Sequence, residues 1–329
     1  MKDMNTNGLV IVGEELCEQL VGRKDAFNAV ESVFAGMARG DAYNFPVVRE
    51  AIGHADALYG LKSGFDRAGH VLGVKSGGYW PGNVQNGMTN HQSTVFLFDP
   101  DTGRLSALVG GNYLTAVRTA ASSSVSIAHL SRQDSKVLGM VGAGHQSQFQ
   151  LRAAAEQRDF EKLVAWNAHP EMLPNLEAVA NEIGLDFEAV DREALCAKAD
   201  VIITITSAFE PLLKKEWIKP GTHLACMGTD TKGKQEIDPA IFSTAQAFTD
   251  EIAQSVSIGE TQHAVASELL KETDIVPIGE VINGDHIGRK DAEEITVFDG
   301  TGVGLQDLAV ASVAAQLARQ QGEATTVQL

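Results

Sequence analysis

The chain has 329 residues, with 26 Lys or Arg against 43 Asp or Glu, so its formal net charge is −17. A field of this sign repels nucleic acids and anionic lipids and argues against both as partners. Hydrophobic residues make up 44% and charged residues 21%, close to the averages of globular domains. A chain of this length is expected to form about two domains, each with its own core.

The first twenty residues contain one short apolar run, Leu9–Val12, followed at once by acidic residues. This pattern matches neither a secretory signal nor a membrane span. Cys17, Cys196 and Cys226 are widely spaced and form no CxxC pair. We therefore expect free core thiols rather than disulfides or a cysteine zinc site, in a cytoplasmic protein.

The N-terminal third and the C-terminus predict short helices and strands. Residues 25–38 place apolar side chains at helical spacing, with Asp25 as the expected N-cap. From residue 57 to residue 110, short alternating runs separated by turn residues predict antiparallel strands. A last apolar-striped helix is expected over 303–320, followed by a polar tail that should be frayed.

In the middle of the chain the predicted secondary structure changes. Residues 114–130 predict a helix, and from Lys136 strand-like and helix-like segments alternate as far as the strand-like run at 222–227. Alternation of this kind indicates βαβ units on a parallel sheet. The predicted fold class is therefore α/β.

A glycine turn in this middle domain predicts dinucleotide binding. The apolar strand 137–141 runs into Gly142-Ala143-Gly144, and a helix follows from His145. The two glycines permit a tight turn and let the backbone approach a pyrophosphate, whose charge the helix N-terminus stabilises. Ser147 stands where this fingerprint has a third glycine, and it is small enough for close packing. The turn thus predicts a Rossmann domain.

The end of the next strand bears on which dinucleotide is bound. The strand 162–166 ends at Asn167, where the fingerprint usually has an acidic residue that holds the ribose hydroxyls. Asn can also do this, more weakly. No Arg follows it to hold a 2'-phosphate, since the next residues are Ala168, His169 and Pro170. These residues favour NAD over NADP.

A second glycine loop offers an alternative nucleotide site. Residues 228–234 match the phosphate-binding pattern GxxxxGK. Gln235 replaces the Ser or Thr that would bind magnesium, however, and Pro239 follows too soon for a long helix. We therefore disfavour a P-loop. The GxSxG, HExxH and EF-hand patterns are absent from the sequence.

Three cations near glycine-rich turns are candidate ligands for an anion: Arg49, Lys75 and Arg118. Each alone also fits a solvated surface position. Together they could hold a carboxylate, because each charged hydrogen bond contributes on the order of 1.5 to 3 kcal/mol once water is excluded. Asp230 follows a strand at the expected carboxyl edge of the parallel sheet, as either a general acid or base or a turn residue. His91 has no paired ligand in view, so we expect no metal site.

These motifs together resemble the ornithine cyclodeaminase/mu-crystallin family over essentially the whole chain. The matching segments are FPVVR ending at Arg49, KSGGYWPGN from Lys75, LFDPDTG from Leu97, LTAVRTAA from Leu114, VGAGHQ from Val141, MGTDTKGKQEID from Met227 and DGTGVGLQD from Asp299. The resemblance implies a homodimeric enzyme. Residues 1–118 and 304–329, the N-terminal segment and the C-terminal helix, would form a smaller α+β domain for substrate binding and dimerisation. Residues 119–303 would form a Rossmann domain that binds NAD.

The resemblance also implies residue roles. The implied substrate-binding residues are Arg49, Lys75, Arg118 and Thr301, and the implied catalytic residues are Lys75 and Asp230, with Asp230 handling the proton. The residues implied to bind the cofactor are Asn90, Arg118, Thr119, Gly142, Gly144, His145, Gln146, Asn167, Thr204, Thr206, Met227, Gly228, Thr229, Asp230, Lys234 and Gly300. Within this set, His145 and Gln146 would cover the pyrophosphate and Asn167 the adenosine ribose.

Departures from the family pattern indicate the substrate. Cyclodeaminases carry a Glu suited to a cationic amino tail, whereas the corresponding run here, residues 59–63, has no carboxylate. A cationic substrate is therefore disfavoured, and Lys62 in this run suits a second carboxylate. Asn90 replaces a Thr that often faces the nicotinamide in relatives.

The expected activity is the NADH-dependent reduction of a small anionic imino acid, with iminosuccinate, reduced to L-aspartate, as the substrate that the pattern favours. The alternatives are a cyclodeaminase-type lyase, an alanine dehydrogenase-type enzyme and a non-enzymatic protein that keeps only the nucleotide loop. The expected partners are a small imino or amino acid and a second copy of the chain, with no nucleic acid, membrane or metal ion.

Overall fold

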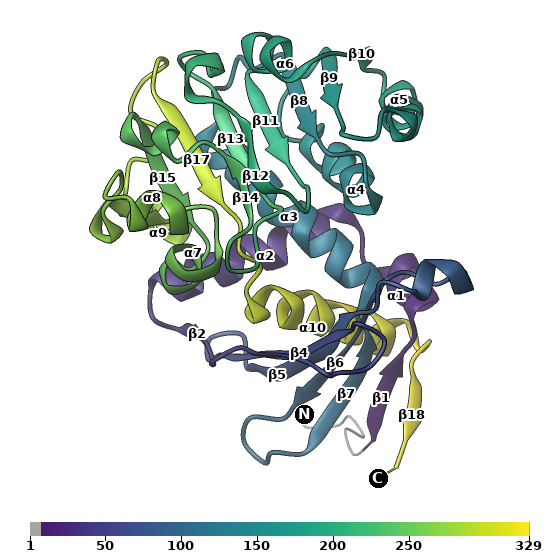
Figure 1. Cartoon of the computed structure of the whole chain (residues 1–329). Coiled ribbons are helices and arrows are strands. Elements are labelled where there is room, and N and C mark those ends of the chain that lie inside the picture. The colour runs from purple at the N-terminus through teal and green to yellow at the C-terminus, as the bar shows by residue number, and fades with distance from the viewer. Residues whose placement is uncertain (1–7, 329) are drawn as a thin grey trace. The chain divides into compact units, whose positions relative to one another are not determined.

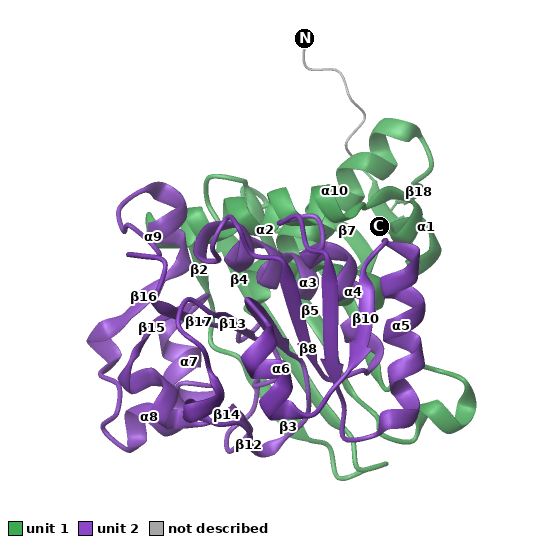
Figure 2. Ribbon diagram, turned by 90° about the horizontal axis from the view of Figure 1, so that it is seen from above, with its two compact units in different colours: residues 1–118, 303–329 green, residues 119–302 purple. Residues whose placement is uncertain are grey.

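A computed structural model describes residues 8–328, and the chain divides into two compact units (Figures 1 and 2). Unit 1 comprises residues 1–118 and 303–329, and unit 2 comprises residues 119–302. The chain passes from one unit to the other inside the long helix α3 (Asn112–Leu130) and again after Gly302. The predicted α/β fold class is confirmed. In the part of the chain that is described, no helix is long and apolar enough to cross a membrane.

Unit 1 is a mixed sheet with helices packed against it. Its strands are β1 (Leu9–Val12), β2 (Ala42–Asn44), β3 (Val48–Ala51), β4 (Leu58–Asp66), β5 (Val71–Tyr79), β6 (His91–Phe98), β7 (Leu105–Gly110) and β18 (Thr325–Val327). They are ordered β18-β1-β7-β6-β5-β4-β2, and β3 pairs with the first half of β4. Only the pair β1 and β7 is parallel among these strands. The helices are α1 (Glu14–Leu20), α2 (Arg23–Ala38), the 3-10 turn η1 (Asn83–Asn86) and α10 (Gly304–Gln321).

The C-terminal helix α10 lies close against this sheet because glycines make room for it (Figure 1). A Cβ on Gly64 would stand 3.0 Å from Leu305, and a Cβ on Gly73 would stand 2.9 Å from Leu308. Both leucines are fully buried. The first turn of α10 is therefore pressed against β4 and β5, which decides where its polar residues point.

Two local predictions for unit 1 were wrong. The C-terminal tail is not frayed, because Thr325–Val327 pairs with β1 in antiparallel register. The β-branched residues of the tail cover an open strand edge, a strong site for backbone pairing. Asp25 is not the N-cap of α2 either; the cap is Gly22, whose N–H donates to the Asp25 carboxylate at 3.0 Å. The acid acts from the third helical position.

Unit 2 contains an eight-stranded parallel sheet. Its strands are β8 (Val137–Val141), β9 (Lys162–Trp166), β10 (Asp186–Ala189), β11 (Val201–Thr204), β13 (His223–Cys226), β15 (Ala245–Thr249), β16 (Ile275–Pro277) and β17 (Ile295–Asp299), in the order β10-β9-β8-β11-β13-β17-β15-β16. A separate small sheet joins β12 (Phe209–Leu213) and β14 (Gln235–Ile237). The helices are α4 (His145–Ala154), α5 (Leu173–Glu182), α6 (Arg192–Lys198), α7 (Ile252–Ile258), α8 (Gln262–Ala266) and α9 (Ile278–Asn283), with short 3-10 turns η2 (Pro170–Met172), η3 (Lys215–Trp217), η4 (Pro239–Ser243) and η5 (Glu272–Asp274).

The parallel sheet places the ends of distant segments at one edge. Every strand pair in it is parallel, so all carboxyl ends lie at the same edge, where ligands bind in such sheets. The predicted alternation over 137–226 is confirmed. The last three strands fall outside it, and β17 lies between β13 and β15 although it follows β15 in the chain.

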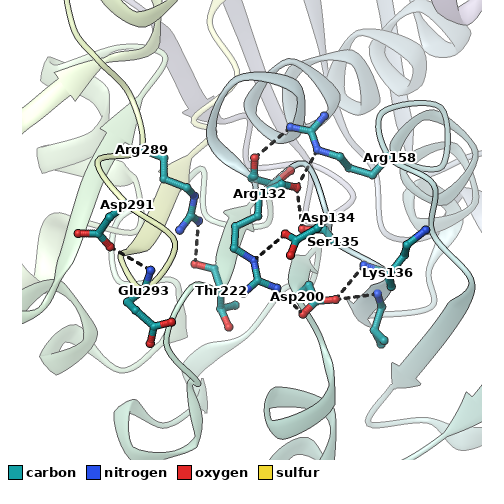
Figure 3. Close-up of polar contacts among 12 residues, drawn as sticks. Arg132, Asp134, Ser135, Lys136, Arg158, Asp200, Thr222, Arg289, Asp291 and Glu293 are labelled. Carbon is teal, nitrogen blue, oxygen red and sulfur yellow. Dashed lines mark hydrogen bonds and ion pairs between the residues drawn. The ribbon is translucent and has the colours of Figure 1, made fainter.

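The opposite, amino edge of this sheet is closed by a network of charged side chains (Figure 3). The Arg158 guanidinium donates to the carbonyl oxygens of Ile127, Ala128 and Ser131 at 2.9, 3.0 and 3.0 Å, at the C-terminal end of α3. Asp200 accepts from Arg132 and from the backbone N–H of Lys136. These contacts satisfy the last carbonyls of α3 and the start of β8. They fix the helix that leads out of unit 1.

Candidate functional site

In unit 1 the candidate site is built around Lys75. This residue lies in the middle of β5, in one of the strands that the sequence predicted between residues 57 and 110, and the glycines around it belong to the same strand. Lys75 is 7% exposed. Its Nζ donates to the Thr115 hydroxyl at 2.8 Å and to Asp307 Oδ1 at 3.1 Å. The ammonium group is thus held by α3 and by α10.

Arg118 reaches the same carboxylate. Its Nε donates to Asp307 Oδ1 at 3.0 Å, and its Nη1 donates to Gln306 Oε1 at 3.1 Å. Arg118 is 7% and Asp307 1% exposed. Two cations that were predicted to bind substrate therefore meet at one oxygen of an acid that lies 232 and 189 residues away in the chain.

Some hydrogen-bond donors of this cluster have no partner in the described chain. A lysine has three N–H donors and an arginine has five. Within the described chain, Lys75 uses two of its donors, and Arg118 uses two. One donor of Lys75 and three of Arg118 have no protein partner there. Charged donors on two largely buried side chains bind an anion more strongly than donors in open water, so the cluster is suited to receive an anion.

The electrostatics of the cluster follow from burial and proximity. Burial lowers the pKa of Lys75 to about 8, against the raising effect of the Asp307 charge. For Asp307, burial acts to raise the pKa, but the charges of Arg118 and Lys75 prevail and lower it to about 2. The carboxylate is therefore ionised at neutral pH, and the cation pair carries one positive charge in excess of it.

Further polar residues share this face of the sheet. Lys62 is paired directly with Lys75 across β4 and β5, and Arg49 is paired with Gly60, two positions from Lys62. Paired and alternate residues project to the same face. His91, on β6, lies in this environment too, where burial and the Lys75 charge lower its pKa to about 3. Its ring is neutral at pH 7 and adds no charge.

Two anchors position the elements of this cluster. Glu14 accepts the backbone N–H groups of Asn112 and Tyr113, at 2.8 and 3.0 Å, and so caps the N-terminus of α3. Asn90, predicted to contact cofactor, accepts the N–H of Val84 at 3.1 Å and donates to the Tyr79 hydroxyl at 3.1 Å. Its side chain holds the segment before β6 in place.

In unit 2 the glycine turn has the geometry of a phosphate cradle. Gly142 has φ +112°, and a Cβ there would stand 2.5 Å from the carbonyl oxygen of Ile205. Its N–H donates to the carbonyl oxygen of Trp166 at 2.9 Å. Gly144 caps α4, and a Cβ there would meet nothing within 4 Å. The first glycine is required by the turn, and the second leaves open space in front of a helix N-terminus.

Further polar groups surround this turn. The N–H of Ser147 donates to the carbonyl oxygen of Gly144 at 3.1 Å, which leaves the N–H groups of His145 and Gln146 at the positive end of the helix dipole for a ligand. Gln146 Oε1 is buried without a hydrogen-bond partner in the described chain. Asn167 accepts the N–H of Ala143 at 3.2 Å and donates to the carbonyl of His169 at 2.9 Å. It thereby ties the turn after β8 to the loop after β9.

A buried acid ties the next two loops together. Glu236 accepts the hydroxyl of Thr204 at 2.6 Å, and both the N–H and the hydroxyl of Thr206 at 2.7 Å. It also accepts the N–H of Gly228 at 2.9 Å. The loops after β11 and β13, which carry predicted cofactor residues, are thus joined by one carboxylate. The hydroxyls of Thr204 and Thr206 are committed to it.

A second buried acid stands behind the first. Glu260 accepts the hydroxyl of Thr229 and the N–H groups of Glu236 and Ile237, the last two at 2.9 and 2.8 Å. Burial raises the pKa of both glutamates, and the Glu236 charge raises that of Glu260 further. The pair therefore holds fewer than two negative charges at neutral pH.

The remaining predicted residues lie at the same carboxyl edge. Asp230 forms an ion pair with Lys234 at 2.8 Å, and Lys234 also donates to the Gly228 carbonyl at 3.2 Å. The Thr301 hydroxyl donates to Asp250 at 2.6 Å. A Cβ on Gly300 would stand 2.5 Å from the Met227 side chain, so these two residues are in close contact.

Only part of this constellation was visible in the sequence. Asp307, Gln306 and Thr115 were not predicted, nor were Glu236, Glu260 and Asp250. Asp307 ends the motif that begins at Asp299, and Glu236 lies in the motif from Met227, but an isolated acid in a motif does not reveal which groups it will meet. Within residues 8–328, no group of three His, Cys, Asp or Glu residues has an arrangement that could hold a metal ion.

Several known proteins are similar to this chain over most of its length. The model of the ornithine cyclodeaminase/mu-crystallin family matches residues 10–322. The iminosuccinate reductase of Paracoccus denitrificans is 60% identical over 98% of this chain and 100% of its own, and its crystal structure in complex with NAD+ matches with a TM-score of 0.95. The alanine dehydrogenase of Archaeoglobus fulgidus is 32% identical over 92% of this chain and 93% of its own. An archaeal alanine dehydrogenase dimer with bound NAD matches with a TM-score of 0.92, at 30% identity over 98% of this chain and 99% of that one.

Proposed function

The chain belongs to the ornithine cyclodeaminase/mu-crystallin family, and we propose that it is an NADH-dependent imine reductase that converts iminosuccinate into L-aspartate. The observation that carries the proposal is the buried pair Lys75 and Arg118, with N–H donors that no group of the described chain uses. Such a pair selects a substrate that brings carboxylate oxygens. The likeness to the Paracoccus enzyme supports iminosuccinate in particular.

The two carboxylates of iminosuccinate match the cations of unit 1. Arg118 offers a planar guanidinium suited to bidentate contact with a carboxylate, and Lys75 adds its remaining N–H. Lys62, opposite Lys75, and Arg49 on the same face are assigned to the carboxylates as well. No acid occupies the run 59–63 to attract the amino tail of ornithine, which disfavours the cyclodeaminase reaction.

Unit 2 is assigned to the cofactor. The open space at Gly144, the free N–H groups at the start of α4 and the joined loops after β11 and β13 fit a dinucleotide. Asn167 is assigned to the adenosine ribose, and the absence of a neighbouring Arg in the sequence favours NAD over NADP. Thr119, Met227, Thr229 and Gly300 complete the set that we assign to the cofactor.

When bound, NADH supplies the hydride that adds to the imine carbon. The imine nitrogen takes up one proton, so that iminosuccinate and NADH give aspartate and NAD+. Asp230 is assigned to this proton, either directly or through water, and its ion pair with Lys234 keeps the carboxylate in place. Thr301, held by Asp250, is assigned to the substrate.

Initial rates with three substrate mixtures test this function. Oxaloacetate and ammonium generate iminosuccinate in solution, so adding them with NADH to the enzyme should consume NADH and yield aspartate. Consumption with pyruvate and ammonium but not with oxaloacetate would instead identify an alanine dehydrogenase. Formation of proline from ornithine without net change in free NADH would identify a cyclodeaminase. Lys75→Met should abolish the first activity while NADH binding is retained.

A homodimer is part of the proposal, and the uncovered face of the unit 1 sheet supports it. Val74, Phe96 and Leu108 are register neighbours, and none of them is buried, whereas Lys75, Val95 and Val109 on the other face are. Val48 and Tyr59, 48% and 39% exposed, extend this apolar face. An apolar face of a sheet is normally covered, and a second copy would cover it.

Light scattering coupled to gel filtration checks the dimer. We expect twice the mass of one chain for the wild type, and a monomer for Phe96→Lys; a monomeric wild type would contradict the proposed dimer.

We also place the enzyme in the cytoplasm. The three cysteines are buried and unpaired, as is usual in a reducing compartment, where NADH is available too.

A further inference from the structure

Asp307 has no role in the function proposed above, yet it is the group that Lys75 and Arg118 share. Its Oδ1 accepts from Lys75 Nζ at 3.1 Å and from Arg118 Nε at 3.0 Å. The two donors come from β5 and α3, which are distinct elements of unit 1. We propose that Asp307 is the positioning residue of the substrate site, which couples Lys75 and Arg118 through one oxygen so that they present their unused donors as a unit.

The packing of α10 fixes the position of the Asp307 side chain. Asp307 lies in the first turn of α10, and that turn packs tightly against the sheet, since a Cβ on Gly304 would stand 3.0 Å from the carbonyl carbon of Lys62. The side chain is 1% exposed and cannot swing away into water. Gln306, its neighbour, holds Arg118 at a second point. The acid therefore fixes which N–H groups are used up and which remain.

The charge of Asp307 has a second effect. Lys75 is buried, which favours the neutral amine, and Asp307 is the neighbour that most strongly opposes this loss of charge. Without the acid, Lys75 and Arg118 would be two buried cations side by side, with Lys62 opposite. Their repulsion would favour release of the Lys75 proton. A neutral Lys75 would bind a carboxylate far less strongly, so Asp307 keeps the site competent for anions.

A purely structural role is the alternative. An acid in the first turn of a helix also stabilises that helix through its dipole. Such a role predicts lower stability of the folded chain without any change in how substrate affinity depends on pH. The coupling role predicts a change in the pH at which substrate affinity is lost.

The experiment compares Asp307→Asn with wild type in the oxaloacetate, ammonium and NADH assay, and it rests on the proposed function. We expect KM for oxaloacetate to rise about tenfold or more, because one carboxylate contact is weakened, while KM for NADH stays within about twofold. The pH above which KM rises should move down by about one unit or more in the variant. Asp25→Asn, the same change in the first turn of α2, should alter neither value.

The outcomes separate the two claims. If wild type consumes no NADH with oxaloacetate and ammonium, the proposed function fails. If wild type is active and Asp307→Asn leaves the pH dependence of KM unchanged, the coupling role fails. Should Asp307→Asn not fold, Asp307→Glu decides, because it keeps the charge but displaces the oxygen. It should raise KM about tenfold at an unchanged pH dependence, and an unchanged KM would overturn the proposal.

Discussion

Glu236 and Glu260 stand in series inside unit 2: the Glu260 carboxylate accepts the backbone N–H of Glu236 at 2.9 Å, while the Glu236 side chain binds Thr204, Thr206 and Gly228. Two acids that are not part of the glycine turn thus hold the loops beside it. A proposed cofactor site depends on both.

Glu236→Gln should weaken NADH binding. The backbone N–H groups of Thr206 and Gly228 donate to the two carboxylate oxygens of Glu236. Gln replaces one of these oxygens with an NH2 group, which cannot accept a hydrogen bond, so the loops after β11 and β13 lose part of their common contact. We expect the Kd of NADH, measured by fluorescence titration, to rise about tenfold, corresponding to roughly 1.4 kcal/mol. Glu193→Gln, an exposed position in the first turn of α6, is the matched control. Equal Kd values for the two variants would contradict this prediction.

The two glycines of the turn should respond differently to a methyl group. Gly142→Ala places a Cβ 2.5 Å from a carbonyl oxygen at a positive φ, so its thermal midpoint should fall. Gly144→Ala meets nothing within 4 Å and has an ordinary φ of −76°. Its midpoint should stay unchanged while its Kd for NADH rises about tenfold, because the methyl group occupies the space proposed for the pyrophosphate. If Gly144→Ala binds NADH as tightly as the wild type, the cofactor does not bind at this turn.

Lys62 should decide between substrates with one and with two carboxylates. It is paired with Lys75 on the face that carries the cation cluster. In Lys62→Met we expect kcat/KM for oxaloacetate with ammonium to fall about tenfold, since one charged hydrogen bond is lost, and kcat/KM for pyruvate with ammonium to change little. Lys24→Met, an exposed position in α2, serves as control. A parallel loss for both substrates would show that Lys62 does not discriminate between them.

The buried acids of unit 2 should make the folded chain less stable as pH rises above about 6.5. Burial raises the pKa of Asp299 to about 7, and the pKa of Glu236 and Glu260 is raised as well. In the unfolded chain these groups ionise at lower pH, so the unfolded chain holds fewer protons than the folded chain. A rise in pH therefore favours the unfolded chain and lowers the free energy of unfolding. Below about pH 6.5 the neutral His91 and His223, whose pKa values burial lowers, act in the opposite direction.

Urea unfolding at about pH 6.5 and about pH 8 measures this effect. Each acid that stays protonated in the folded chain lowers the free energy of unfolding by about 1.4 kcal/mol per pH unit. Glu260→Gln has no proton to lose and should show a flatter dependence than wild type. A wild-type stability that is constant or rises across this interval would contradict the assignment of protonated acids.

The sequence predicted those features that depend on neighbours in the chain. The glycine turn, the parallel alternation over 137–226 and the antiparallel strands before residue 110 each have a local pattern. The C-terminal strand had none, because Thr325–Val327 becomes a strand only by pairing with β1. The strand that carries Lys75 was predicted, but its glycines gave no sign that they would let α10 approach the sheet.

The candidate site divides along the same line. Lys75 and Arg118 could be named from motifs, but Asp307 joins them only because α10 returns from the end of the chain to pack on β4 and β5. In the same way, Glu236 reaches Thr206 because parallel strands bring separate loops to one edge. The order of the residues determines which charges the chain carries and which turns and strands form locally. Which buried charge meets which partner is decided by packing, since burial removes the water that would otherwise satisfy each group alone.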